Sequence, residues 1–278
     1  MAGSRADGNK LNMIVWPETS VPDYLLESEE ATAFVQNLLK GGVPLLAGSM
    51  DAAGTNDHWR FYNSAILLDA SGRAVQRYDK VHLVPFGEYI PLAGALPFLQ
   101  RLAPMGWTCT PGTVNTVFRL PGAEGRFSAL ICFEDAFPEL ARADVRDGAR
   151  LLVNLTNDAW FDRSAGALQH LSHCIFRCVE NRVSAVRAAN SGLTCFIDRN
   201  GELYHQEFRN GETLARRGPI PPLEEAWTAS GVYVAAPNMP LTLYTRRGDL
   251  VLAIPAAFVS ALCLLLAFLP RTSVNRPG

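Results

Sequence analysis

The sequence predicts an α/β fold with mixed sheets packed in layers, and three observations lead to it. Short apolar runs that are typical of buried strands alternate with segments of helical periodicity. Turn residues separate several of the apolar runs, as in Asp69-Ala70-Ser71-Gly72, and this is the pattern of hairpins. Charged residues make up only 19% of the 278 positions, so the chain can bury a sizeable core. Alternating strands and helices with interspersed hairpins indicate a layered α/β architecture.

The first half of the chain is expected to consist of strands with one helix among them. The helix covers residues 27–40 and ends at Gly41-Gly42. A long loop carries residues 80–91 between two strand pairs. The expected strands are residues 12–16, 43–47, 61–68, 74–78, 114–120 and 126–131.

The second half is expected to contain two helices, at residues 135–147 and 164–189. A Pro-rich segment at 217–222 has the composition of a linker. The expected strands are residues 151–155, 193–197 and 202–208, of which the last two flank the turn Asp198-Arg199-Asn200-Gly201.

Residues 250–269 form an uncharged run of twenty residues. A helix of this length spans about 30 Å, the thickness of the hydrocarbon core of a bilayer. A buried core helix is the alternative, but the length of the run and the arginines on both sides favour a transmembrane helix. Because these arginines are nearly symmetric, they do not set its orientation. Residues 1–11 are expected to be a disordered N-terminus and residues 270–278 a tail.

Three residues that follow apolar runs carry the functional groups of covalent acyl transfer, namely Glu18, Lys80 and Cys132. A cysteine attacks as its thiolate, so it needs a base to take its proton. A fixed ammonium stabilises the oxyanion that forms when a carbonyl is attacked, and the N–H of Phe133 can be a second donor. Each residue alone also fits an ordinary role: a small buried cysteine, a solvated loop carboxylate and an exposed lysine.

Four motifs place these residues in context. They are Trp-Pro-Glu-Thr at 16–19, the run from Lys80 to Pro91, Cys-Phe-Glu at 132–134 and Asn-Asp-Ala-Trp-Phe at 157–161. With them the chain, from about residue 12 to residue 197, resembles the carbon–nitrogen hydrolase (nitrilase) family. The long second motif, Cys-Phe-Glu and Asn-Asp-Ala-Trp-Phe together favour the apolipoprotein N-acyltransferase branch of that family.

The resemblance implies a nitrilase-like αββα sandwich over residues 12–235, N-terminally truncated and followed by one C-terminal transmembrane helix. It implies that Cys132 is the nucleophile, Glu18 the general base and Lys80 the oxyanion stabiliser. Glu88 matches a supporting glutamate, and Phe133 and Glu134 match positions that flank the nucleophile. The alternatives are that Glu88 is a loop carboxylate and that Glu134 is a charge at a helix N-terminus.

The implied reaction is N-acylation of the lipidated N-terminal cysteine of an apolipoprotein. A phospholipid is the acyl donor, the diacylglyceryl-modified apolipoprotein is the acceptor, and a thioester on Cys132 is the intermediate. No cofactor or metal is expected. One alternative is an amidase or nitrilase that releases its product to water. Another is an inactive remnant with intact motifs.

The expected location is the bacterial inner membrane. Members of the acyltransferase branch begin with several membrane helices, and they have a strand and a helix, including a functional tryptophan, before the Trp-Pro-Glu strand. Residues 2–10 are polar. The chain is therefore expected to be the C-terminal piece of a longer protein or the product of a truncated reading frame. With the N-terminal helices, the catalytic domain would face the periplasm. A net charge of −2 gives no basic signature for nucleic acid.

The six cysteines show no paired CxxC metal motif. Cys174 and Cys178 lie one helical turn apart near His170 and His173, so a metal cluster is conceivable. Their periodicity favours one apolar helix face instead. No disulfide is inferred.

Overall fold

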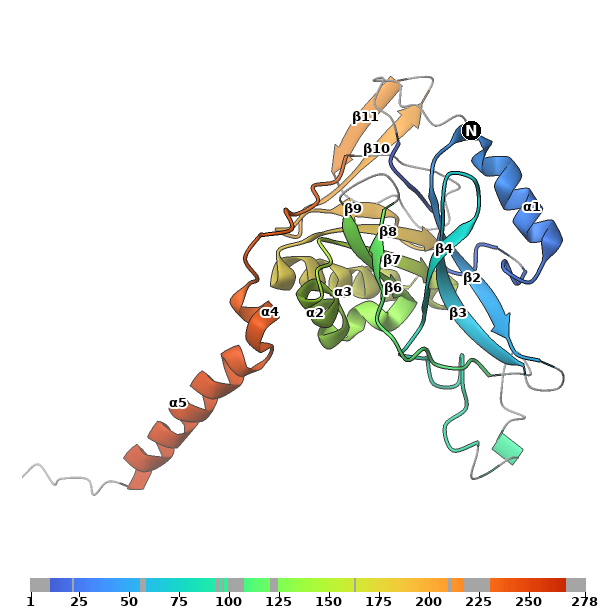
Figure 1. The fold of residues 1–278 in the computed structure, drawn as a ribbon. Coiled ribbons are helices and arrows are strands. Elements are labelled where there is room, and N and C mark those ends of the chain that lie inside the picture. Colours follow the sequence, from blue (N-terminus) through green and yellow to red (C-terminus); the bar gives the residue numbers. More distant parts are fainter. Residues whose placement is uncertain are drawn as a thin grey trace, which may run out of the picture.

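Two sheets form the body of the protein (Figure 1). The computed structural model describes residues 11–21, 23–55, 59–93, 96, 98–99, 108–120, 125–162, 164–209, 212–217 and 231–268. The expected N-terminus at 1–10, linker residues 218–222 and tail residues 270–278 lie outside this set.

The first sheet has the order β1-β2-β3-β4, in which β1 pairs parallel to β2 and the other pairs are antiparallel. Its β3–β4 pair is the hairpin expected around residues 69–72. The strands are β1 (Ile14–Val15), β2 (Leu45–Ala53), β3 (Arg60–Leu68) and β4 (Ala74–Asp79).

The second sheet has the order β11-β10-β9-β8-β7-β6-β5. Its centre, β6-β7-β8, is parallel, and the neighbouring pairs on both sides are antiparallel. The strands are β5 (Val117–Arg119), β6 (Arg126–Ile131), β7 (Leu151–Asn157), β8 (Ser184–Asn190), β9 (Cys195–Ile197), β10 (Leu203–Arg209) and β11 (Glu212–Arg217).

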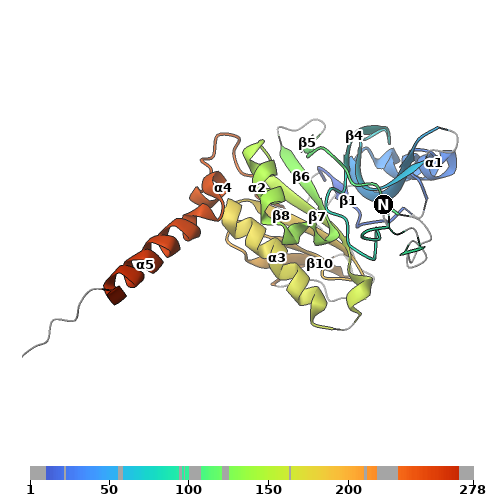
Figure 2. The same ribbon diagram turned by 90° about the horizontal axis from the view of Figure 1, so that it is seen from below.

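Alternation along the strands produces the layers. On β2, Leu45 faces helix α1 (Glu29–Leu38), whereas Leu46 packs between the two sheets against residues of β6 and β7. Helices α2 (Pro138–Arg146) and α3 (Gly166–Asn181) cover the opposite face of the second sheet, as Figure 2 shows. The order helix, sheet, sheet, helices is the αββα sandwich that the sequence predicts.

The expected helix at 164–189 is wrong in its last third, residues 182–189. Helix α3 ends at Asn181, Arg182 takes a left-handed conformation with φ of 55°, and β8 follows. Strand β8 pairs with β7 over its whole length. Residues 167–191 contain no Gly or Pro that would mark the end of the helix. Residues 184–190 form a strand because β8 is central in the second sheet, which is covered by helices on one face and by the first sheet on the other.

Other boundaries also differ from expectation. The helix predicted at 135–147 is a 3₁₀ helix at Cys132–Ala136 followed by α2, which has Pro138 in its first turn. Strand β2 continues six residues beyond residue 47, because β3 pairs with all of it. Strands β1 and β5 are shorter than the apolar runs that predicted them. Strand β11 has no counterpart among the predicted elements.

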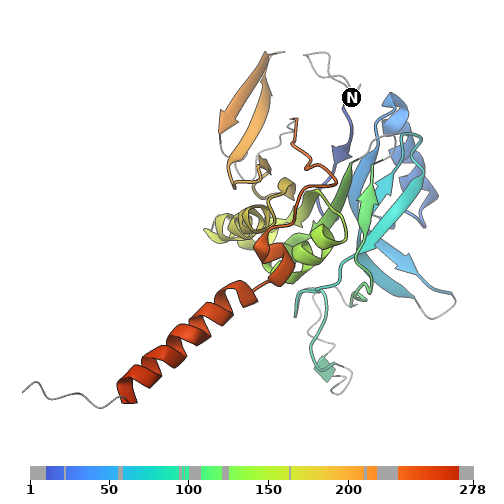
Figure 3. The same ribbon diagram turned by 60° about the vertical axis from the view of Figure 1, so that its left-hand side comes forward.

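Helix α5 (Leu250–Phe268) follows the short helix α4 (Leu243–Arg247) and projects away from both sheets (Figures 1 and 3). None of its residues is buried against the rest of the described chain. It is long and apolar enough to cross a bilayer, with a mean hydropathy of 2.6. A core helix would be covered by other elements, and none of the described residues covers α5.

Candidate active site

Glu18 lies in the turn that follows β1, with only 6% of its surface exposed. The turn passes directly over Gly48 of β2. A Cβ atom at Gly48 would lie 2.3 Å from the carbonyl oxygen of Pro17 and 2.6 Å from Cα of Glu18. Only glycine leaves room for this crossing, so Gly48 determines how deeply Glu18 sits.

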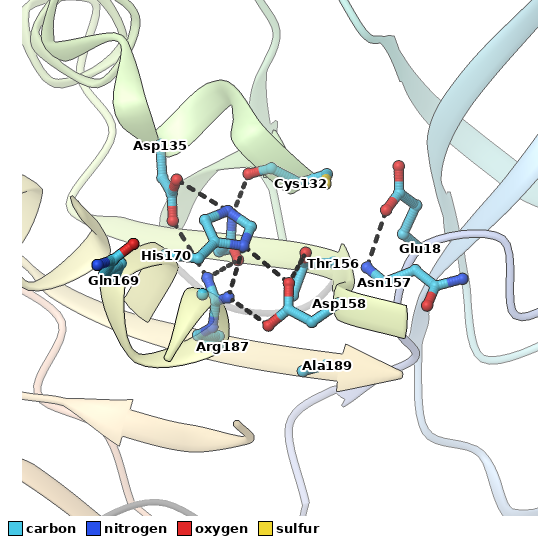
Figure 4. A network of polar contacts seen from close by, with 12 residues as sticks. Glu18, Cys132, Asp135, Thr156, Asn157, Asp158, Gln169, His170, Arg187 and Ala189 are labelled. Atoms are coloured by element: carbon cyan, nitrogen blue, oxygen red, sulfur yellow. Dashed lines mark hydrogen bonds and ion pairs between the residues drawn. The ribbon is translucent and has the colours of Figure 1, made fainter. Parts of the chain in front are cut away.

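The two oxygens of the Glu18 carboxylate have different partners. Oε1 accepts a hydrogen bond from Nδ2 of Asn63 at 2.7 Å and lies 3.5 Å from Nζ of Lys80. Oε2 accepts from the backbone N–H of Asn157 at 2.9 Å, as Figure 4 shows. Donors from both sheets therefore hold this carboxylate in place.

Lys80 follows β4 directly, and its side chain is 1% exposed. Its ammonium lies 2.8 Å from Oε1 of Glu88. Burial alone lowers the pKa of Lys80, but the charges of Glu18 and Glu88 outweigh it, so this pKa lies above its ordinary value. Lys80 is therefore a buried cation at neutral pH.

Glu88 is part of the same cluster and not a solvated loop residue, with 11% of its side chain exposed. Its Oε1 also accepts from Nδ2 of Asn63 at 2.8 Å, and its Oε2 accepts from the N–H of Val84 at 2.8 Å. Asn63 of β3 thus donates to both Glu18 and Glu88. Sequence reasoning missed Asn63, because it lies inside a strand and outside the four motifs.

Cys132 begins the 3₁₀ helix after β6, with a left-handed φ of 53°. It is partly buried, and its sulfur points to the side on which Glu18 lies (Figure 4). Burial raises the pKa of the thiol to about 12; the charge of Glu18 adds to this increase and that of Lys80 opposes it. The resting thiol is therefore neutral, and it lies within electrostatic reach of both a carboxylate and an ammonium.

Glu134 does not join this cluster but lies fully buried beneath it. It connects the loop after Lys80 to the turn at Cys132. Burial raises the pKa of Glu134, and its hydrogen bonds oppose this effect. Oε1 accepts from Tyr78 Oη at 2.8 Å, Val81 N at 2.7 Å and His82 N at 3.1 Å, and Oε2 accepts from Ile131 N at 2.8 Å.

Phe133 points elsewhere and is 43% exposed. Its ring meets Phe137 edge-on, with 5.9 Å between ring centroids, and His173 at 6.2 Å. Its side chain therefore forms part of an aromatic surface beside the turn, while its backbone follows the thiol.

A second polar network lies behind Cys132 and was not expected as such (Figure 4). Arg187 is its centre and contacts Asp135, Asp158 and Asn154. Burial lowers the pKa of His170, but the carboxylates of Asp135 and Asp158, which lie 3.1 and 2.7 Å from its ring nitrogens, outweigh it and raise this pKa to about 9. The sequence predicts a helix at Arg187, and it indicates His170 only as part of a conceivable metal cluster.

The metal alternative finds no support within the described residues, where no group of three or more His, Cys, Asp or Glu side chains has the geometry to hold an ion. Cys174 and Cys178 are fully buried, and both belong to the apolar core beneath α3. Their spacing thus reflects one helix face.

The profile of the carbon–nitrogen hydrolase family matches residues 1–215. The chain belongs to the carbon–nitrogen hydrolase family. Its fold also resembles a carbon–nitrogen hydrolase from Helicobacter pylori, with a TM-score of 0.54, 16% sequence identity, and coverage of 75% of this chain and 76% of the other. That likeness concerns the fold alone.

Curated relatives of this carbon–nitrogen hydrolase carry the name apolipoprotein N-acyltransferase. The protein from Geobacter metallireducens is 41% identical over 214 residues, covering 74% of this chain and 41% of the relative. The protein from Bradyrhizobium diazoefficiens is 34% identical over 273 residues, covering 95% of this chain and 46% of the relative. The chain therefore spans less than half the length of these two relatives.

Proposed function

We propose that this member of the carbon–nitrogen hydrolase family is an acyltransferase that transfers an acyl chain from a phospholipid to the lipidated N-terminal cysteine of an apolipoprotein. The observation that carries the proposal is the buried Glu18–Lys80–Glu88 cluster within electrostatic reach of the Cys132 thiol. The names of the relatives and the exposed apolar helix α5 support the choice of lipid substrates.

In the first step, the sulfur of Cys132 attacks the carbonyl carbon of the acyl ester while Glu18 takes the thiol proton. Proton transfer must accompany attack, because the thiol is neutral at rest. The Lys80 ammonium stabilises the oxyanion, with the N–H of Phe133 as a second donor. The ester C–O bond then breaks, the leaving oxygen takes the proton from Glu18, and a lysophospholipid departs from the thioester.

In the second step, the α-amine of the acceptor attacks the thioester carbonyl. Glu18 takes a proton from the amine as the C–N bond forms. The C–S bond breaks, the sulfur of Cys132 receives that proton, and the amide product leaves. Both steps use the same base and the same oxyanion donors, so one site completes the cycle without a metal or cofactor.

Helix α5 fits this chemistry because both substrates are lipid-anchored. A segment held in the bilayer raises their effective concentration at a tethered site. Within this proposal the protein resides in the bacterial inner membrane, with the catalytic domain on the periplasmic side when N-terminal membrane helices precede it.

A hydrolytic amidase or nitrilase is the second candidate, since the same three groups can cleave a C–N bond and pass the acyl group to water. It is favoured by the family to which the chain belongs. It gives no role to the exposed apolar face of α5.

The deciding experiment uses the whole chain in detergent with a phospholipid that carries a radiolabelled acyl chain. We expect label on Cys132, and transfer to a diacylglyceryl-cysteine peptide added afterwards. The Cys132→Ala variant should give neither product. Label that remains in this variant would remove Cys132 from its role. Release of free fatty acid, or turnover of small amides only, would favour the hydrolase. An unlabelled wild-type chain would indicate an inactive piece.

A further inference from the structure

The buried network around Arg187 requires the fold to remove several charged groups from water, which is energetically unfavourable. Arg187 is 0% exposed, and its guanidinium lies 3.1 Å from Asp135 and 3.0 Å from Asp158. Buried ion pairs of this kind are often no more stabilising than a well-packed apolar group of similar volume. The network therefore calls for an explanation beyond the stability of the core.

Two residues of the network and one apolar residue lie side by side across the parallel strands. Leu130 of β6 pairs in register with Asn154 of β7, and Asn154 pairs with Arg187 of β8. This row ends two residues before Cys132 on the first of these strands. The register thus places Arg187 of β8 in the same row as Leu130, near the end of β6.

Arg187 determines which way the Asn154 amide faces. Nη1 of Arg187 lies 2.6 Å from Oδ1 of Asn154, and a guanidinium can only donate. The carbonyl of the amide must therefore face Arg187, so its NH₂ group faces β6. There Nδ2 donates to the backbone carbonyls of Leu130 at 3.2 Å and Cys132 at 3.1 Å.

The Cys132 carbonyl belongs to a strained residue. Its φ of 53° is a left-handed conformation that is strained for a residue other than glycine. Such a conformation persists only when its surroundings hold it. Glu134 holds the donor side of the turn through the N–H of Ile131, and Asn154 holds the acceptor side through the carbonyl of Cys132.

We infer that Asn154 and Arg187 are positioning residues that hold Cys132 in its left-handed backbone conformation, from which the thiol faces Glu18 and Lys80. The inference rests on the proposed function, in which Cys132 is the nucleophile. Neither residue touches a substrate in this role. Asn154 acts on the Cys132 backbone, and Arg187 acts through Asn154.

Asn154→Leu tests the inference, because it keeps the side-chain volume and removes both donors. Asn154→Asp is the second variant, since it keeps an acceptor toward Arg187 but cannot donate to the carbonyls. The matched control is Asn181→Leu. Asn181 is 2% exposed, donates to the Arg177 carbonyl and accepts from Thr245. Its loss removes a comparable buried amide at the far end of α3.

The first measurement is the single-turnover rate of Cys132 acylation by radiolabelled phospholipid. We expect both Asn154 variants to be slower than wild type by about 10- to 100-fold, with half-saturation within about threefold, since a small misplacement of a nucleophile acts on rate. Asn181→Leu should lower the melting temperature but keep the rate within about threefold. Asn154 variants as fast as this control would overturn the inference.

A second measurement does not depend on the reaction. Iodoacetamide alkylation of Cys132, followed by peptide mass spectrometry across pH, reports the surroundings of the thiol. Burial and the charge of Glu18 both raise the pKa of the Cys132 thiol. A thiol released from this place should titrate closer to an ordinary cysteine, so the alkylation midpoint should fall in Asn154→Leu and stay in Asn181→Leu. If wild type forms no acyl-enzyme, the proposed function fails, but this shift still tests the positioning. Equal midpoints in Asn154→Leu and the control would refute it.

Discussion

The ammonium of Lys80 lies 2.8 Å from the carboxylate of Glu88. Glu18 is farther from the same ammonium, at 3.5 Å. The shorter contact with Glu88 holds the cation, whereas the Glu18 carboxylate is held mainly by Nδ2 of Asn63 at 2.7 Å and the N–H of Asn157 at 2.9 Å. Two carboxylates around one ammonium thus have different tasks within the proposed mechanism.

Glu88→Gln should separate these tasks. The substitution removes the charge that holds Lys80 and keeps one oxygen, which can accept from Asn63 or from Val84. We expect acylation of Cys132 to fall by about 10- to 100-fold in a folded protein, since the oxyanion donor is less fixed. Glu139→Gln, in the first turn of α2, is the control and should retain wild-type activity. An unchanged acylation rate in Glu88→Gln would contradict the role given to Glu88.

Glu18→Gln should have opposite effects on two properties of Cys132. The negative charge of Glu18 contributes to the raised pKa of the thiol, and Lys80 acts against it. Removing that charge should lower the pKa, so alkylation by iodoacetamide should begin at lower pH than in wild type. Acyl transfer should nevertheless be lost, because no base remains to take the proton. Retained transfer with a lowered alkylation midpoint would show that another group serves as base.

Gly48→Ala should damage the site through packing alone. The added methyl group would meet the backbone of Pro17 at 2.3 Å, so the turn that carries Glu18 must move. We expect a loss of stability of about 1–3 kcal/mol together with a lower acylation rate. Gly125→Ala is the matched control, since a Cβ there meets no atom within 4 Å. Thermal denaturation and single-turnover acylation of both variants make the comparison.

His170 should make stability depend on pH. Its pKa is raised from 6.5 to about 9, mainly by Asp135 and Asp158 against the effect of burial. A raised pKa means that the folded state binds the proton more tightly. The stabilisation is therefore complete below about pH 6.5 and is lost as pH rises through about 9, by roughly 2–3 kcal/mol. Denaturant unfolding at pH 6.5 and 9.5 should show this loss in wild type, and His170→Gln should remove most of the difference.

The sequence predicted the layered fold and, apart from Asn63, the residues of the Glu18–Lys80–Glu88 cluster, because local patterns mark both. Glu18, Lys80 and Cys132 follow strands, and the strands are visible as apolar runs. Glu88 lies inside a distinctive motif. Their gathering in space was implied by the resemblance, since nothing local relates a residue near the N-terminus to one more than a hundred positions later.

Local sequence patterns could not predict the network around Arg187, and the reason is physical. Arg187 lies in a segment that continues the helical periodicity of α3 without a Gly or Pro. The chain leaves the helix at Arg182, a residue type with no preference for the left-handed conformation it takes. Asn63 and Asn154 lie inside strands, and the hydrogen-bond partners of such an amide depend on which strands pair beside it.

Glu134 has a consequence for how substrates are chosen. One carboxylate joins the loop after Lys80 to the strand end that carries Cys132, so neither segment can shift without breaking buried hydrogen bonds. In the proposed mechanism, the oxyanion donor and the sulfur are therefore preassembled before a lipid binds. In that mechanism, induced fit contributes little to the discrimination between acyl donors. The path by which a lipid tail enters the site decides which donor reacts.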